Sequence, residues 1–146
     1  MGKPRYLYHG SRTLVTELVP SPATGVGPAK DQLCAVYASH IADFATAFAL
    51  PLTPNENGKT AWKMDFDPGK PEVIILAGSL DLSGTGYLYR VPSDSSEPID
   101  DLQWVSYDPV VPIDYEVIDP AKYAHWVRYA GEDEKLGDLK ADQTAG

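Results

Sequence analysis

Cysteine, histidine and long hydrophobic runs are all scarce in this chain. Its one cysteine, Cys34, excludes an internal disulfide and a cysteine-built zinc site. The three histidines, His9, His40 and His125, lack the spacing of metal ligands. No stretch approaches the roughly 18 consecutive apolar residues of a membrane-spanning helix, and no long apolar segment follows the basic N-terminal residues as in a secretory signal. We therefore expect a cytoplasmic protein that neither crosses a membrane nor binds a metal.

Basic residues are few as well, since 12 Lys and Arg stand against 21 Asp and Glu, a formal net charge of -9. So acidic a chain binds phosphate backbones poorly, and nucleic acid is not an expected partner. The segment between Arg90 and Lys122 has no basic residue and holds eight acids: Asp94, Glu97, Asp100, Asp101, Asp108, Asp114, Glu116 and Asp119. Two interpretations stay open. These acids are solvated loop residues, or one or two of them face a cation or a transition state that becomes cationic.

The length of 146 residues predicts one domain, and 43% hydrophobic with 23% charged residues is typical of a globular chain. We place this domain at residues 1–130. A charged and flexible tail is expected at residues 131–146, where apolar residues are few. The 13 prolines and 12 glycines predict short elements joined by many loops.

Short strands dominate the predicted secondary structure. Apolar runs and alternation predict strands at 5–10, 34–38, 60–66, 72–76, 86–91, 102–107 and 111–118. Apolar residues at 41, 44, 45, 48 and 49 follow helical spacing, so a helix is expected over 40–50, ended by Pro51. A loop is expected at 19–32, a mobile loop at 92–101 and a short helix at 121–129. This pattern favours an α+β fold.

Three segments carry residue types suited to chemistry. They are residues 7–12 (Leu-Tyr-His-Gly-Ser-Arg), residues 36–39 (Val-Tyr-Ala-Ser) before the expected helix, and residues 103–108 (Gln-Trp-Val-Ser-Tyr-Asp). Each has a plain structural explanation when it is taken alone. A histidine at a strand end is usually a satisfied polar group, a tyrosine before a helix usually belongs to the core, and Gln-Trp fits ordinary strand alternation.

Taken together and in this order, the three segments resemble the ADP-ribosyltransferase superfamily. The resemblance is to its His–Tyr–acid branch, which includes diphtheria-type toxins, poly(ADP-ribose) polymerases and the small rifamycin ADP-ribosyltransferases of antibiotic resistance. The rifamycin enzymes are about as long as this chain, and their Gly-Tyr-Ile-Tyr strand is matched by Gly-Tyr-Leu-Tyr at residues 86–89. The resemblance covers residues 5–119. It implies a split β-sandwich of two small sheets with few helices.

The resemblance implies that NAD is the co-substrate and that residues 9–12 bind it. His9 would hydrogen-bond the adenosine ribose, and the backbone of Gly10 would pair with the nicotinamide carboxamide. Gly10 suits this role because a residue without Cβ allows close approach. Ser11 would add a side-chain hydrogen bond, and Arg12 would face the pyrophosphate or the adenine end.

The second segment and the helix after it would hold the nicotinamide ring. Tyr37 would stack on nicotinamide, and Phe48 or Phe44 would form the opposite wall. Ser39 is placed by the same resemblance among the NAD-binding residues. His40 and His125 are expected to have structural or solvent-facing roles.

The third segment departs from the family pattern. Where the polymerases place a catalytic glutamate, this chain has Gln103, which can orient a ribose hydroxyl but supplies no negative charge. The rifamycin enzymes also lack that glutamate and use an aspartate in the preceding loop. Asp100 and Asp101 lie where such a residue would be. Either one of them is the acid or the acid is absent, and Gln103 argues against polymer formation.

The function implied is mono-ADP-ribosyl transfer, in which NAD is cleaved, nicotinamide leaves and ADP-ribose passes to an acceptor. The acceptor would be a small molecule of the rifamycin kind or a protein. Three alternatives remain: an NAD-hydrolysing toxin, a catalytically weak module that binds NAD or ADP-ribose, and an RNA 2′-phosphotransferase. The last would need several arginines around a phosphate, and the low arginine content argues against it.

Overall fold

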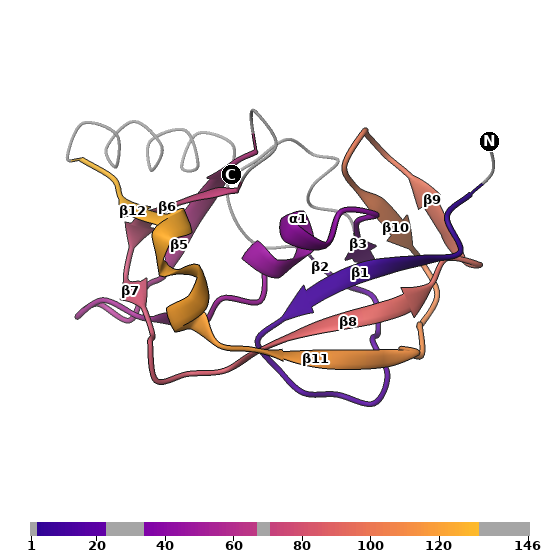
Figure 1. Ribbon diagram of the computed structural model, residues 1–146, viewed down its shortest axis with the longest axis horizontal. Coiled ribbons are helices and arrows are strands. Elements are labelled where there is room, and N and C mark those ends of the chain that lie inside the picture. Colours follow the sequence, from indigo (N-terminus) through magenta and orange to yellow (C-terminus); the bar gives the residue numbers. More distant parts are fainter. Residues whose placement is uncertain (1–2, 23–33, 67–70, 132–146) are drawn as a thin grey trace.

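A computed structural model describes residues 3–22, 34–66 and 71–131 (Figure 1). Within these residues the chain forms four small sheets, a six-residue α-helix and a 3₁₀-helix. The α+β character expected from the sequence is confirmed, but the two small sheets implied by the resemblance are four instead. Frequent prolines and glycines interrupt backbone pairing, so several strands have only two or three residues.

The first sheet contains strands from the N-terminal and the C-terminal parts of the expected domain. Strand β1 (Tyr6–Ser11) pairs antiparallel with β8 (Gly86–Pro92), and β8 pairs antiparallel with β11 (Asp114–Ile118). In this register His9 is opposite Tyr89 and Gly10 is opposite Leu88. The three strands lie close to the predicted ranges, because their sequences alternate polar and apolar residues, although all of β11 except Ile118 is exposed.

The second sheet has the order β2-β3-β10-β9. Its strands are β2 (Ser21–Pro22), β3 (Cys34–Ala38), β10 (Trp104–Ser106) and β9 (Ser96–Pro98). A bridge between Tyr8 and Ser39 connects it to β1 in the first sheet. This bridge places the end of β3 against the middle of β1.

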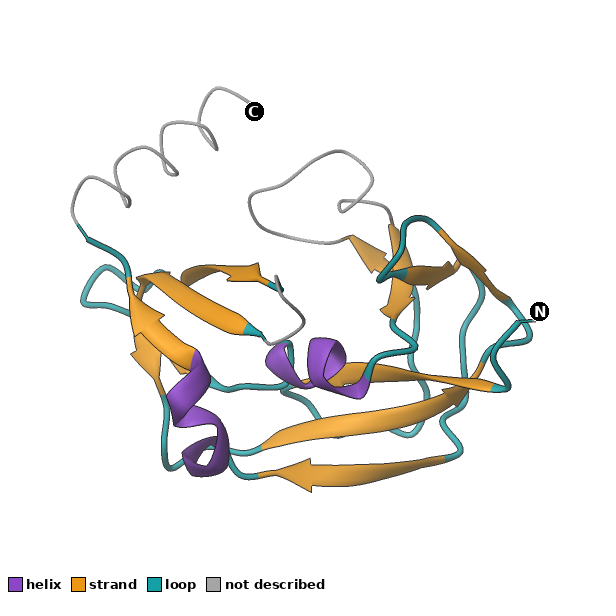
Figure 2. Cartoon of the chain, turned by 45° about the horizontal axis from the view of Figure 1, so that its top comes forward, coloured by secondary structure: helices purple, strands orange, loops and turns teal. Residues whose placement is uncertain are grey.

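The third sheet lies on the other side of the helix from the second sheet (Figure 2). It contains β5 (Ala61–Asp65) and β6 (Glu72–Ala77), which are antiparallel, and β12 (Val127–Tyr129), which runs parallel to β6. A fourth sheet of two strands joins β4 (Leu52–Thr53) to β7 (Ser79–Leu80).

Helix α1 (Ala42–Ala47) is shorter than the helix predicted over 40–50. The Ser39 hydroxyl accepts the N–H of Ile41 at 3.0 Å and so fixes the start of the segment. After Ala47 the bonds become i to i+3, with Phe48 N–H donating to the Ala45 carbonyl at 3.1 Å, so the last turn is tightened. Pro51 then ends the segment, as predicted.

Two apolar clusters form the core on either side of β1 and β8. One cluster contains Ala45 of α1, Ala49 after the helix, Ile75 of β6 and Leu88 of β8. The other gathers β1, β3 and β8 through Leu7, Val36, Ala38, Tyr89 and Val91. Helix α1 therefore belongs to the first cluster, in which it packs against β1, while Phe48 directly after the helix contacts Trp62 of β5 (Figures 1 and 2).

Two predicted segments are corrected by the structure. The mobile loop predicted at 92–101 contains β9, a short edge strand that pairs with β10 through backbone groups and leaves Glu97 and Pro98 exposed. The helix predicted at 121–129 is a 3₁₀-helix, η2 (Pro120–Trp126), followed by β12. Residues 21 and 22 of the loop predicted at 19–32 form β2, and the rest of that loop from residue 23, like the tail after residue 131, lies outside the described residues. No helix among the described residues combines the length and apolar character needed to span a membrane.

Candidate functional site

His9 lies on β1 and reaches β3 through its imidazole. Its Nδ1 lies 2.5 Å from the backbone carbonyl oxygen of Tyr37, and because a carbonyl only accepts, Nδ1 donates the proton. Nε2 of the neutral ring is then an acceptor. Burial lowers the pKa of His9, and the hydrogen bond to Tyr37 opposes this shift with a smaller effect. The site therefore contains a neutral imidazole of fixed tautomer.

Acidification is expected to destabilise the fold through His9. Because burial puts the folded-state pKa of His9 below the ordinary value of 6.5, the unfolded chain binds a proton first as the pH falls. The free energy of unfolding should therefore decrease below about pH 6.5. Urea unfolding at a series of pH values measures this. His9→Asn should flatten the dependence, whereas His125→Asn, at an exposed histidine, should leave it in place; the same slope in both variants would contradict the assignment.

The backbone of Gly10 lies at the edge of β1 opposite β8, beyond the point where Ser39 pairs with Tyr8. Tyr8 exchanges two backbone hydrogen bonds with Ser39, at 2.7 and 2.8 Å, on the side of β1 away from β8. Backbone groups two residues apart in a strand point to the same side, so the N–H and C=O of Gly10 point to this edge too. No described residue outside the first sheet forms a backbone hydrogen bond with Gly10. One donor and one acceptor therefore lie side by side at the edge.

The missing Cβ of Gly10 serves the packing of α1. A Cβ at this position would lie 1.9 Å from the carbonyl oxygen of Ala45, and one at Gly86 on the neighbouring strand would lie 1.9 Å from that of Ala49. The close approach expected at Gly10 is therefore made by the helix, across the face of the sheet. The packing of the helix is thus a structural reason for the glycine, beside the predicted approach of a ligand, which stays a prediction.

Ser11 and Arg12 are engaged within the protein. The Ser11 hydroxyl accepts the N–H of Thr13 at 3.1 Å and so shapes the turn after β1. The Arg12 Nε donates to the carbonyl of Leu50 at 2.8 Å, beyond the end of α1. Burial lowers the pKa of Arg12 by desolvation. Arg12 thus connects the end of β1 to the segment after the helix, next to the predicted NAD site.

Aromatic residues of α1 and β5, and of the positions directly after each, form a connected cluster. The ring of Phe44 lies 5.4 Å from that of Phe48 and 5.5 Å from that of Phe66, and Phe48 lies 5.1 Å from Trp62. Phe44 is 8% exposed and Phe48 is 40% exposed. Of the two predicted walls, Phe48 is the one that presents surface to a ligand. Tyr37 lies on the face of β3 opposite Val36 and Ala38, which enter the core.

Asp100 and Gln103 form one hydrogen-bonded unit before β10. Asp100 Oδ1 accepts the backbone N–H groups of Leu102 at 2.8 Å and Gln103 at 2.7 Å, and its Oδ2 accepts Gln103 Nε2 at 3.1 Å. Asp101 is exposed beside this turn. The unit directly precedes β10, and β10 pairs with β3 so that Val105 is opposite Tyr37. The pairing of the two strands therefore fixes the position of the unit relative to Tyr37.

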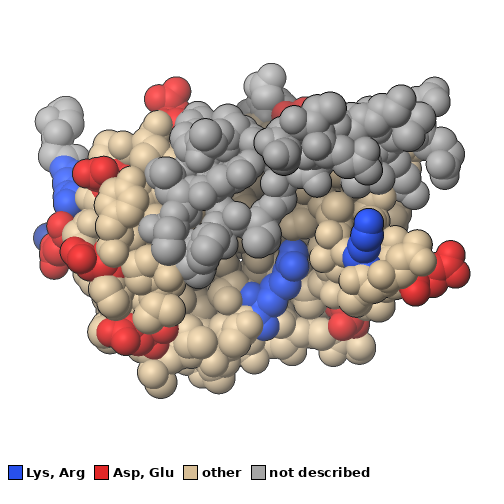
Figure 3. Space-filling model, turned by 180° about the vertical axis from the view of Figure 1, so that it is seen from behind, with Lys and Arg blue, Asp and Glu red and all other residues tan. Residues whose placement is uncertain are grey.

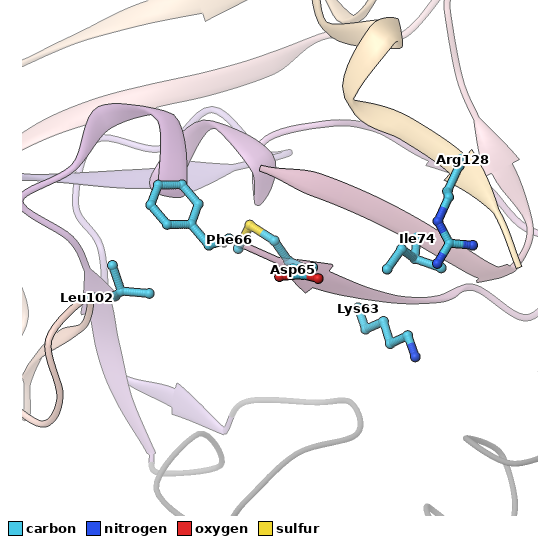
Figure 4. A pocket seen from close by; sticks show the side chains of 7 residues that line it. Lys63, Asp65, Phe66, Ile74, Leu102 and Arg128 are labelled. Atoms are coloured by element: carbon cyan, nitrogen blue, oxygen red, sulfur yellow. The ribbon is translucent and has the colours of Figure 1, made fainter. Parts of the chain in front are cut away.

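A pocket of about 560 Å³ lies between this loop and the third sheet (Figure 4). Its lining comprises Lys63, Met64, Asp65, Phe66, Ile74, Leu102 and Arg128. None of these residues is predicted from the sequence to belong to a site. The signal available was the Trp62, Met64, Phe66 alternation in a short strand, which is also the ordinary pattern of a core-facing strand.

Some acids of the basic-free segment have structural partners. Asp114 binds Arg90 through both carboxylate oxygens, at 3.1 and 2.6 Å, and Asp119 accepts the N–H of Ala121 at 3.0 Å at the start of η2. Seen from behind, acidic side chains lie mainly toward the rim of the molecule (Figure 3). In the part of the chain that the structure describes, no three His, Cys, Asp or Glu side chains are grouped to hold a metal ion.

The site therefore combines a neutral histidine, a strand edge with one donor and one acceptor, aromatic walls and a carboxylate–amide unit. Comparisons of the chain with protein-family models, with characterised proteins and with solved structures found no match.

Proposed function

We propose that this protein cleaves NAD and transfers ADP-ribose once to an acceptor. The observation that carries the proposal is the edge of β1 at Gly10, where an N–H and a C=O lie side by side. A primary carboxamide, such as that of nicotinamide, offers the complementary acceptor and donor. His9 adds a neutral acceptor, Nε2, one residue away on the same strand.

The remaining residues fit the other needs of the reaction. Tyr37 and the partly exposed Phe48 would enclose the nicotinamide ring by stacking. His9 Nε2 would accept a hydrogen bond from an adenosine ribose hydroxyl. Gln103 would hold a hydroxyl of the nicotinamide ribose, oriented by its bond to Asp100.

The chemistry requires negative charge near the reacting ribose. As the C1′–N bond breaks, nicotinamide leaves with the electron pair and the ribose becomes an oxocarbenium ion, as in glycoside hydrolysis. An acceptor oxygen or nitrogen then bonds to C1′ and loses its proton. A carboxylate from Asp100 or Asp101 would stabilise the cation, and an amide at position 103 favours one transfer over polymer growth.

Incubation of the protein with NAD and a panel of candidate acceptors, beside a reaction without acceptor, tests the proposal through release of nicotinamide, measured by chromatography. We expect release, and we expect His9→Ala to lower kcat/KM by about 10²-fold or more because ribose binding and orientation are lost together. His40→Ala is the matched control and should retain the wild-type rate. Release with no acceptor added would identify a hydrolase, and saturable NAD binding without release would identify a binding module. No binding and no release would reject the proposal.

A further inference from the structure

We propose that the pocket of about 560 Å³ between β5, β6, β12 and Leu102 is the acceptor site, and that it takes a small amphipathic molecule with an apolar ring system and an acidic group. This inference rests on the proposed function. The inference goes beyond the proposed function because it assigns the chemical class of the acceptor from residues that are not part of the proposed NAD site.

The position of the pocket connects it to the candidate acid. Leu102 lies in its wall, directly between Asp101 and Gln103 in the chain. The backbone N–H of Leu102 is held by Asp100 Oδ1 at 2.8 Å, so pocket wall and carboxylate belong to one turn. On the other side Phe66 contacts Phe44 of α1 at 5.5 Å between ring centroids, and Phe44 contacts Phe48, the aromatic wall of the proposed NAD site, at 5.4 Å. An acceptor here would lie next to the reacting ribose.

The lining of the pocket has two chemically different ends (Figure 4). Phe66 and Leu102 lie toward one end, and Lys63 and Arg128 lie toward the other, with Asp65 between them. The lining contains two cationic side chains and one acidic side chain. This charge balance is the reverse of that of the whole chain, in which 21 acidic residues exceed 12 basic residues. Arg128 also contacts Glu72 at 3.4 Å in a half-exposed ion pair, which is a weak interaction in water.

This arrangement selects a class of ligand. A ring system packed against Phe66, Met64 and Leu102 would bury apolar surface, which favours binding but discriminates little between different apolar ligands. A sulfonate, carboxylate or phenolate at the other end would form charge-assisted hydrogen bonds with Lys63 and Arg128. A hydroxyl of the same molecule near Leu102 would attack C1′ of the ribose, while the C1′–N bond breaks, neutral nicotinamide leaves and the hydroxyl proton passes to solvent or to the carboxylate.

A pair of fluorescent probes tests the binding part without NAD. A hydroxynaphthalene sulfonate carries the ring, the hydroxyl and the charge, and naphthol lacks only the charge. We expect the sulfonate to bind saturably and about tenfold more tightly than naphthol. Lys63→Met with Arg128→Met should remove that preference while naphthol binding persists. Lys59→Met with Lys122→Met, which removes the same charge from exposed positions, should retain it. Absent saturable binding, or equal losses in both double variants, would overturn the assignment.

The same sulfonate tests the acceptor role when NAD is added. We expect its ADP-ribosylated product by mass spectrometry, at a level that falls about tenfold in the Lys63→Met, Arg128→Met variant. Nicotinamide release without any product, although the sulfonate binds, would reject the acceptor role and leave NAD cleavage standing. No nicotinamide release with any acceptor would instead reject the proposed function, and the NAD-free binding result would still decide the ligand class of the pocket.

Discussion

Gly10→Ala is expected to destabilise the protein by at least about 3 kcal/mol, at the upper end of overpacking effects. The new Cβ would lie 1.9 Å from the Ala45 carbonyl oxygen, a backbone atom that moves only if α1 moves. Thermal unfolding should show a Tm lower by roughly 10 °C or more. Gly86→Ala should behave similarly, because its Cβ would meet the Ala49 carbonyl oxygen at the same distance.

Gly131→Ala is the matched control, since nothing lies within 4 Å of a Cβ at that position. It should leave Tm nearly unchanged. If Gly10→Ala also kept the wild-type Tm, helix α1 would not be seated on β1 as described, and the strand edge that carries the proposed function would lose its support.

Removal of one carboxylate before β10 is expected to lower kcat for nicotinamide release by about 10²-fold or more while NAD still binds. The candidates are Asp100 and Asp101, and Asp→Asn at each removes charge with little change of shape. In Asp100→Asn the amide oxygen can still accept the N–H groups of Leu102 and Gln103, but the amide nitrogen cannot accept from Gln103 Nε2 as Asp100 Oδ2 does. The Gln103→Ala variant therefore measures how much of the loss comes from the orientation of Gln103. Steady-state assays of both variants, beside Gln103→Ala, measure the effect.

The pattern of rates distinguishes charge from positioning. A large loss in one Asn variant, with Gln103→Ala less affected, would identify the acid. Asp100→Ala should in addition lower the free energy of unfolding by about 1–3 kcal/mol, since two backbone donors lose their acceptor. If both Asn variants kept full rate and only Gln103→Ala were inactive, neither aspartate would supply the charge.

The strands were predictable where side-chain alternation and apolar content agree. Cys34–Ala38 was predicted at its observed bounds, and β5, β6 and β8 within a residue or so. Strand β9 was missed because Ser96, Glu97 and Pro98 have turn-forming side chains, and it is the backbone pairing with β10 that makes them a strand. Such tertiary pairing leaves no local pattern. The same holds for β12, whose parallel partner β6 lies far back in the chain.

The candidate site was predictable in its residues but not in its contacts. The His-Gly pair and Tyr37 were singled out, yet periodicity cannot show that the His9 ring would bond the Tyr37 carbonyl across 28 positions. The packing reason for Gly10 could not be predicted, because the helix that occupies the space of its Cβ comes from a distant segment. The pocket at Lys63 and Arg128 was not found, since it is assembled from β5, β6, β12 and the loop before β10.

The pairing of β1 with β8 also determines when this protein can fold during synthesis. His9 and Gly10 leave the ribosome early, but their partners Tyr89 and Leu88 follow roughly 80 residues later, a delay of roughly 4–16 s at typical translation rates. Until then the edge of β1 that pairs with β8 is unpaired, and the Leu7 side chain, fully buried in the native core, lacks its contacts with β8. The nascent N-terminal segment is therefore a natural client for a chaperone, and a chain halted before β8 would have the motif residues of the site without their geometry.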